Sequence, residues 1–124
     1  MHDLNLAAFL HDIGFLMLPH DLTIGVNTLD PESYVAVQNH PRLGASLLEL
    51  FFFLREASVL MAHHHERWDR SGYPYGIRGR FIPLGARILS IAVAFDAIHI
   101  PEVSNRVAAG TQFDPELVEA LCPF

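Results

Sequence analysis

The tripeptide Asp-Pro-Glu occurs twice, at residues 30–32 and 114–116, and it constrains the fold more than any other local feature. In each copy the aspartate can accept hydrogen bonds from the first unpaired backbone amides of a helix. The proline has the φ angle of a first helical residue, and the glutamate lies near the positive end of the helix dipole. Both copies therefore predict helix starts. No alternating β pattern and no internal repeat is found in the chain, which favours an all-α fold.

The remaining elements are expected to be helices joined by short loops. Helical spacing of apolar residues and the positions of proline and glycine predict their bounds. The expected helices cover residues 4–12 (ended by Gly14), 30–39, 41–52 and 56–66, with one more after Pro83 and a short one from Asp114. Residues 15–29 are expected to be irregular. Residues 68–82, which contain three glycines and Pro74, are expected to form a long ordered loop, a kind of segment that is often functional.

Length and composition predict a single packed domain over residues 1–124. The chain is 51% hydrophobic and 18% charged, as expected of a globular protein. Its net charge of −6 disfavours binding to a nucleic-acid polymer. The single cysteine, Cys122, excludes an intramolecular disulfide and indicates a reducing compartment. No secretory leader is visible, and charged residues interrupt the most apolar stretch, 43–62. We therefore expect a cytoplasmic protein without a membrane span.

The positive charge is unevenly distributed. The chain has no lysine, and five of its eight arginines fall between Arg67 and Arg87, where Asp69 is the only acid. One interpretation is a solvated loop and helix face. The other is a phosphate-binding loop, because the planar guanidinium group suits phosphate oxygens.

Histidine and aspartate occur in a pattern suited to a metal centre. The tract His63–Glu66 is accompanied by His11-Asp12 and by His40, and imidazole and carboxylate ligands are typical of hydrolytic rather than closed structural metal sites. Each fragment alone has a plainer interpretation, as a helix cap, a surface histidine or an exposed tract. Asp96 could be a ligand or a buried, hydrogen-bonded acid. We interpret His2, His20 and His99 as structural.

Taken together, the motifs resemble the HD-GYP branch of the HD phosphohydrolases. The resemblance rests on His11–Gly14, His40-Pro41, His64–Glu66 with Asp69, and Gly72–Pro74, and it extends through residues 83–89 and 110–116. It implies an HD-domain-like helical bundle with a long GYP loop. It also implies hydrolysis of cyclic di-GMP or a related cyclic dinucleotide, with a hydroxide bound to the metal as nucleophile. The expected ions are iron or manganese, with zinc, nickel or magnesium as alternatives.

The resemblance also assigns roles to individual residues. It implies catalytic roles for His11 and Asp12 and substrate contacts for Arg67, Arg70 and Tyr73. The metal ligands would be His11, Asp12, His40, His64 and His65. Tyr73 could stack on a base or hydrogen-bond a phosphate, and the alternative is a merely structural aromatic. Domains of this branch commonly follow a sensory or receiver domain, so a signalling partner is expected.

The chain departs from the family pattern at several positions. A ligand histidine and further helices are expected upstream of the ten residues that precede His11. A polar segment between Ala97 and Gly110 is shortened. Phe15 stands where a lysine is usual, Arg70 where glycine is usual, and Val93 where a ligand aspartate is usual. Valine cannot coordinate a metal, and Asp96 could replace the missing carboxylate only if the helix shifts.

These departures affect the two expected ions unequally. Asp12, His40, His64 and His65 complete one ion site, whereas the other keeps only His11 and the shared Asp12, so one ion rather than two is expected. Loss of the second ion removes the clamp on attacking and leaving oxygens. Three functions follow: a working phosphodiesterase with ligands supplied from elsewhere, a degenerate metal- or nucleotide-binding regulatory module, or an interaction domain without catalysis. We expect an impaired phosphodiesterase.

Overall fold

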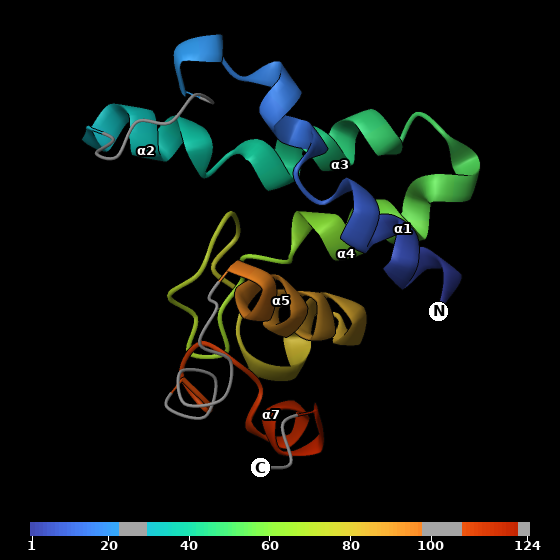
Figure 1. Ribbon diagram of the computed structural model, residues 1–124, viewed down its shortest axis with the longest axis vertical. Coiled ribbons are helices and arrows are strands. Elements are labelled where there is room, and N and C mark those ends of the chain that lie inside the picture. The colour runs from blue at the N-terminus through green and yellow to red at the C-terminus, as the bar shows by residue number, and fades with distance from the viewer. Residues whose placement is uncertain (23–29, 98–107, 122–124) are drawn as a thin grey trace. The chain divides into compact units, whose positions relative to one another are not determined.

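The computed structural model describes residues 1–22, 30–97 and 108–121. Its α-helices are α1 (His2–Leu10), α2 (Pro31–Val37), α3 (His40–Leu48), α4 (Arg55–Ala62), α5 (Leu84–Ala97) and α7 (Pro115–Leu121), shown in Figure 1. Short 3-10 turns are η1 (Ile13–Met17), η2 (His20–Leu22), η3 (Phe52–Leu54) and η4 (Gly79–Phe81). Within the described ranges there is no strand, only an isolated bridge between Ala109 and Phe113. The predicted all-α class is confirmed.

Residues 1–62 form one compact unit. In this unit α3 packs against α4 and η1, and α1 packs against α4. The buried residues Ala45, Leu48, Met61 and Ala62 form its core, with Leu10, Ile13 and Leu54 at the margin. Burial of a side chain the size of Leu48 or Met61 stabilises a fold by about 1.5 to 3 kcal/mol. This core holds α3 and the end of α1 together, and these two segments carry the first group of candidate ligands.

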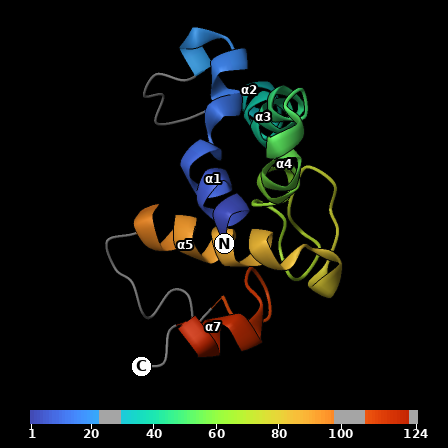
Figure 2. The ribbon, with the colours of Figure 1, turned by 90° about the vertical axis from the view of Figure 1, so that its right-hand side faces the viewer.

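Residues 63–124 form a second compact unit. Here α5 contacts α7, as Figure 2 also shows, around a core of Ile91, Phe113 and Val118. Residues 68–82 contain no α-helix and only the short turn η4, as predicted for a long loop. The loop has little regular secondary structure, but hydrogen bonds hold it in a defined conformation.

Both Asp-Pro-Glu segments begin helices as predicted. The Asp30 carboxylate accepts the Ser33 backbone N–H at 2.8 Å at the start of α2. The Asp114 carboxylate accepts the Glu116 N–H at 3.0 Å at the start of α7. These contacts satisfy amides that have no partner inside the helix.

Four helix ends were predicted too far along the chain. The helices end at Leu10, Val37, Leu48 and Ala62 rather than at residues 12, 39, 52 and 66. After each end the chain tightens into three-residue turns, such as the one in which the Glu66 N–H binds the His63 carbonyl at 3.0 Å. Such turns are common where an α-helix runs out. The three adjacent histidines therefore follow α4 rather than ending it.

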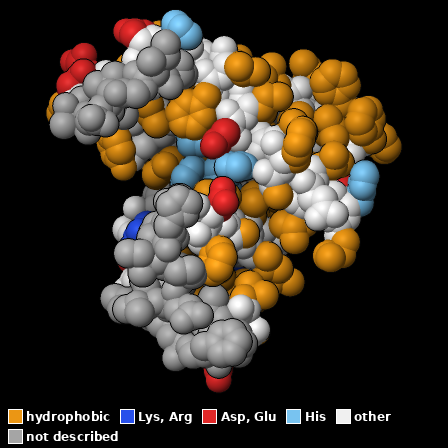
Figure 3. Space-filling view, in the orientation of Figure 1, with side chains coloured by type: hydrophobic (Ala, Val, Ile, Leu, Met, Phe, Trp, Pro, Cys, Tyr) orange, Lys and Arg blue, Asp and Glu red, His pale blue; other side chains and the backbone are white. Residues whose placement is uncertain are grey.

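The surface of residues 1–62 carries exposed apolar side chains. In the view of Figure 3, hydrophobic side chains cover much of the visible surface of this unit. Leu50, Phe52 and Phe53, in the turn between α3 and α4, are 78%, 81% and 70% exposed. No helix in the described part of the chain has the length and apolar character needed to cross a membrane.

Candidate functional site

His11, Asp12 and His40 lie together within residues 1–62. Nε2 of His11 is 3.2 Å from Oδ2 of Asp12, and Nε2 of His40 is 3.4 Å from Oδ1 of the same carboxylate. Two ligand atoms bound to one ion, each at about 2.1 Å, lie roughly 3.0 to 3.5 Å apart. Each carboxylate oxygen thus faces a different imidazole at a separation that suits a shared ion.

Backbone carbonyls orient both imidazoles. Nδ1 of His11 is 2.7 Å from the Ala8 carbonyl oxygen, and Nδ1 of His40 is 2.8 Å from that of Val37. A carbonyl oxygen only accepts, so each Nδ1 carries the proton, and in a neutral ring Nε2 then presents a lone pair. A lone pair facing a carboxylate oxygen is repulsive unless a cation or a second ring proton lies between them. Hydrogen bonds of this kind from the distal ring nitrogen are typical of metal-binding histidines.

Gly14 allows the segment after Asp12 to approach α3. A Cβ on Gly14 would lie 1.9 Å from the His40 carbonyl oxygen, so any larger residue would force the first turn of α3 away. We expected Gly14 to end the first helix. That helix ends earlier, at Leu10, and Gly14 is absent from the positive-φ residues, so its role is close packing. Phe15 stacks on the His40 ring, with centroids 4.1 Å apart, at the position where the family pattern has lysine.

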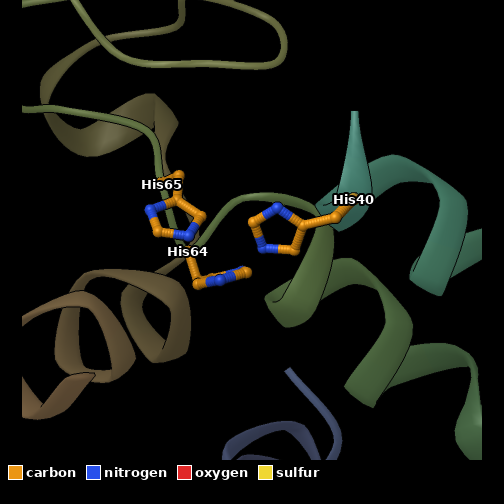
Figure 4. Close-up of side chains that lie close together, drawn as sticks. All are labelled: His40, His64 and His65. Carbon is orange, nitrogen blue, oxygen red and sulfur yellow. The ribbon is translucent and has the colours of Figure 1, made fainter. Parts of the chain in front are cut away.

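His64 and His65 follow α4 directly and are drawn with His40, the first residue of α3, in Figure 4. The His64 and His65 rings are neighbours, with centroids 4.0 Å apart. His64 is only 1% exposed. The Tyr73 ring stacks on the His65 ring at 4.9 Å, and the Tyr73 N–H donates to the His65 carbonyl at 3.2 Å. Tyr73 therefore positions His65, which supports the structural alternative without excluding a substrate contact.

A cavity of about 310 Å³ adjoins these two histidines. Its lining consists of His64, His65, Glu66, Arg67, Tyr73, Ser90, Val93, Ala94 and Gln112. Val93 thus lies in the same wall as two candidate ligands, which is where the family resemblance implies a carboxylate. Asp96 lies elsewhere: it is exposed rather than buried, and it lines a hollow with Ile88 and Phe95. Of the two alternatives for Asp96, the buried, hydrogen-bonded acid is therefore wrong.

Glu66 anchors the loop to the histidine segment. Its carboxylate accepts the Tyr75 N–H at 2.7 Å and the Ile77 N–H at 3.1 Å, and the residue is only 3% exposed. A buried carboxylate is favourable only with such hydrogen bonds. The sequence placed Glu66 beside the ligands but gave no sign of these two loop partners, which lie nine and eleven residues further on.

Gly72 is required for the loop to fold back on the histidines. A Cβ there would lie 2.3 Å from the Arg67 nitrogen and 2.5 Å from the His65 oxygen. The Tyr73–Pro74 peptide bond that follows is cis. Nearby, hydrogen bonds from the Ser71 hydroxyl and amide hold the pKa of Asp69 below its usual value. Residues 66–73 are therefore closely packed and leave no room for a side chain at position 72.

Gln112 completes the lining of the cavity. The Trp68 and Asp69 N–H groups donate to the Gln112 and Thr111 carbonyls, at 3.1 and 2.8 Å. These bonds place Gln112 in the cavity lining with Tyr73. Gln112 was not predicted to be a site residue. Its only signal was its position in the 110–116 motif.

The clustered arginines have different surroundings. Arg67 lines the cavity and its Nε is 3.6 Å from Asp69 Oδ1. Arg87 donates to the buried Asp114 carboxylate and, through Nε, to the Ile82 carbonyl. Arg70 is outside the cavity lining and borders a separate hollow. Arg67 and Tyr73 are thus brought together with His64 and His65, whereas Arg70 is not.

The donor set fits a divalent transition metal. His11 and His40 present oriented imidazoles to a carboxylate in one unit, and His64 and His65 present adjacent imidazoles in the other. Cysteine does not occur among these residues. Imidazole with carboxylate suits iron, manganese, zinc or nickel rather than a closed structural zinc site.

Comparison with known proteins agrees with this chemistry. An HD domain family model matches residues 1–112. A cyclic di-GMP phosphodiesterase of Vibrio cholerae is 32% identical over 92% of this chain and 27% of its own length. The cyclic di-GMP phosphodiesterase response regulator RpfG of Xanthomonas campestris is 35% identical over 95% of this chain and 35% of its own length. A 3'3'-cGAMP-specific phosphodiesterase of Vibrio cholerae is 32% identical over 93% and 25%.

The chain spans about a third or less of the length of these relatives. The match nevertheless includes the HD pair, the later histidines and the GYP segment, since the family model ends at residue 112. The chain therefore belongs to the HD domain family, in its HD-GYP branch.

Proposed function

We propose that this chain is the metal-binding part of a cyclic dinucleotide phosphodiesterase. With the residues that it has, the chain would hold one divalent ion through Asp12, His40, His64 and His65. Its activity on cyclic di-GMP or a related cyclic dinucleotide would be impaired. The observation that carries the proposal is the orientation of His11 and His40, whose Nε2 atoms face separate oxygens of Asp12. A carboxylate shared between two ion positions is expected to divide its oxygens in this way.

Two sets of residues would act on the substrate. When bound, a divalent ion polarises a phosphate oxygen and lowers the pKa of water. His11 and Asp12 would carry the catalytic role. The negative charge of the Asp12 carboxylate would stabilise positive charge between the two imidazoles. Arg67 and Tyr73, which line the cavity of His64 and His65, would orient the phosphate and a base. The predicted substrate contact of Arg70 stays a proposal, and titration of cyclic di-GMP against Arg70→Ala and Tyr73→Ala tests it.

Metal stoichiometry tests the proposed ligand set. We expect close to one ion per chain by elemental analysis of protein loaded with iron or manganese. His40→Ala and His64→Ala should each remove that ion. A site with three histidines and one carboxylate loses most of its affinity for the metal when any one of these ligands is removed. His2→Ala, which removes an exposed histidine of α1, is the control. Retention of the ion in either ligand variant would contradict a shared site.

The alternative is a regulatory module that binds metal or nucleotide without catalysis. It is favoured by Val93, which lines the cavity beside His64 and His65 but offers no ligand atom. Val93→Asp should raise the metal content above one ion per chain or increase cyclic di-GMP hydrolysis, though not to full activity. Ala92→Asp adds the same charge at an exposed neighbouring position outside this cavity and should do neither. Rapid turnover by the unmodified, metal-loaded chain would show that Val93 has no such effect.

We further infer a signalling role with a sensory, receiver or other regulatory partner, and a cytoplasmic location. The first inference is supported by the family and by the response regulator among the relatives. The second rests on the single cysteine and on the expected cyclic dinucleotide ligand. Fractionation of cells that express the tagged full-length protein tests the location.

A further inference from the structure

The 67–82 loop carries a second hollow whose lining differs from that of the histidine cavity. It has a volume of about 400 Å³ and is lined by Arg70, Tyr75, Gly76, Ile77, Arg78 and Phe81. None of these residues lines the cavity of His64 and His65. An adjoining hollow of about 420 Å³ shares Arg78 and Phe81 with it and also borders Trp68. Both volumes are within the range of small-molecule sites.

Two arginines at this hollow differ from the other clustered arginines in their ion pairing, although Asp69 borders the adjoining hollow. Three of the five clustered arginines form ion pairs: Arg67 with Asp69, Arg80 with Glu116, and Arg87 with Asp114. Arg70 and Arg78 form none with the acids of residues 1–22, 30–97 and 108–121, and both are exposed. Two such guanidinium groups at one hollow attract anions, and their planar donors match phosphate oxygens.

The backbone at Arg70 points to a role for its side chain. Arg70 has a φ of 76° and is the only non-glycine residue with positive φ in the described ranges. A side chain in this left-handed region strains the backbone, and glycine would avoid that strain. We therefore expect the guanidinium group of an arginine in this conformation to make a favourable interaction that offsets the backbone strain.

Two aromatic rings border the same hollow. Tyr75 is 53% exposed and Phe81 is 82% exposed, so each has ring surface available to a ligand. Exposed aromatic rings offer faces on which nucleobases stack. Such rings, together with guanidinium groups that have no ion pair within the described residues, match the two chemical halves of a nucleotide.

We propose that this hollow binds a nucleoside phosphate, with the phosphate on Arg70 and Arg78 and the base on Tyr75 or Phe81. The site needs no metal ion and does not depend on the proposed phosphodiesterase function. A nucleic-acid polymer is a poorer match because the chain as a whole has a net charge of −6.

Fluorescence of Trp68 reports on the site, because Trp68 is the only tryptophan of the chain and borders the adjoining hollow. We would titrate metal-free protein, stripped with a chelator and then desalted, with GMP, guanosine and inorganic phosphate. GMP should change the fluorescence saturably, and guanosine and phosphate should each bind at least about tenfold more weakly. Phosphate binding as tight as GMP binding, or no saturable GMP signal, would overturn the proposal.

Arg70→Gly separates binding from folding. It relaxes the backbone, so the variant should keep or raise the thermal stability of the chain while weakening GMP binding at least about fivefold, the effect of losing roughly one charge-assisted hydrogen bond. Arg78→Ala should weaken binding similarly. Arg42→Ala removes the same charge from an exposed position of α3 and should leave binding unchanged. An equal loss in Arg42→Ala, or no loss in both loop variants, would show that the hollow is not the site.

Discussion

Residues 1–62 and 63–124 orient their candidate ligands by different means. In the first unit, His11 and His40 each donate to a carbonyl three residues earlier, so the ring direction is set within one turn of chain. In the second, His65 lies against Tyr73, and the loop that carries Tyr73 is held by Glu66 and by the Gln112 carbonyl. A hydrogen bond within one turn therefore orients each imidazole of the first unit, whereas the orientation of His65 depends on contacts distributed over the second unit.

The two Asp-Pro-Glu segments show the same difference. Asp30 is exposed, and its carboxylate accepts the N–H and the hydroxyl of Ser33, three residues on. Asp114 has a side chain that is 2% exposed, and it both begins α7 and binds Arg87 of α5. One motif thus acts as a local cap in the first unit and as a cap and link between elements in the second.

Removing the Asp114 carboxylate should have the largest effect on stability. Asp114→Ala leaves the largely buried Arg87 guanidinium without its acid, and loss of one partner of a buried pair costs about 3 to 5 kcal/mol. Denaturant unfolding should show this loss for Asp114→Ala and a far smaller one for Asp30→Ala. Asp114→Asn, which keeps a capping oxygen but not the charge, should lie between them. Equal losses at positions 30 and 114 would abolish the contrast between the units.

Glu66→Gln should have the next largest effect and should be confined to the loop. The glutamine has one acceptor oxygen for two backbone N–H groups and places its own NH2 against one of them, which costs about 2 kcal/mol. Amide exchange of Tyr75 and Ile77 should accelerate, while amides of α3 should not change. Glu119→Gln, at an exposed position of α7, is the matched control. Acceleration throughout residues 1–62 as well would show that the loop contact is not local to its unit.

Sequence patterns predicted the helical class and the helix starts because those features depend on neighbouring residues. Caps at Asp30 and Asp114 need only amides two or three positions away. Helix ends were less predictable, because the three-residue turns after Leu48 and Ala62 have no distinctive sequence signal. The true role of Gly14 depends on the His40 carbonyl, 26 residues later, and local sequence carries no information about such a contact.

The candidate site was predictable to a similar degree. The family resemblance identified the candidate ligand histidines and Val93, and the structure brings His64, His65 and Val93 to one cavity. Glu66 as an anchor, Gln112 as a wall residue and the separation of Arg70 from that cavity were not predicted. Each follows from how the loop folds back through Gly72, which is a property of the folded unit.

The smallest expected effect concerns two exposed aspartates, one in each unit. It tests whether the difference between local contacts in the first unit and distributed contacts in the second is confined to buried groups. Hydrogen bonds from Ser33 hold the pKa of Asp30 below 3.8, and those from Ser71 do the same for Asp69. A carboxyl whose pKa is lower in the folded state stabilises the fold above pH 3.8, and this stabilisation is lost as pH falls through the folded value. Thermal unfolding of Asp30→Ala and Asp69→Ala should thus differ slightly from wild type near neutral pH, and both differences should shrink as the pH falls through the folded pKa values, which lie below 3.8. If the differences persist at low pH, the hydrogen bonds to serine are not their cause. If only Asp69→Ala differs strongly from wild type in thermal unfolding, then the contacts of exposed carboxylates also differ between the two units.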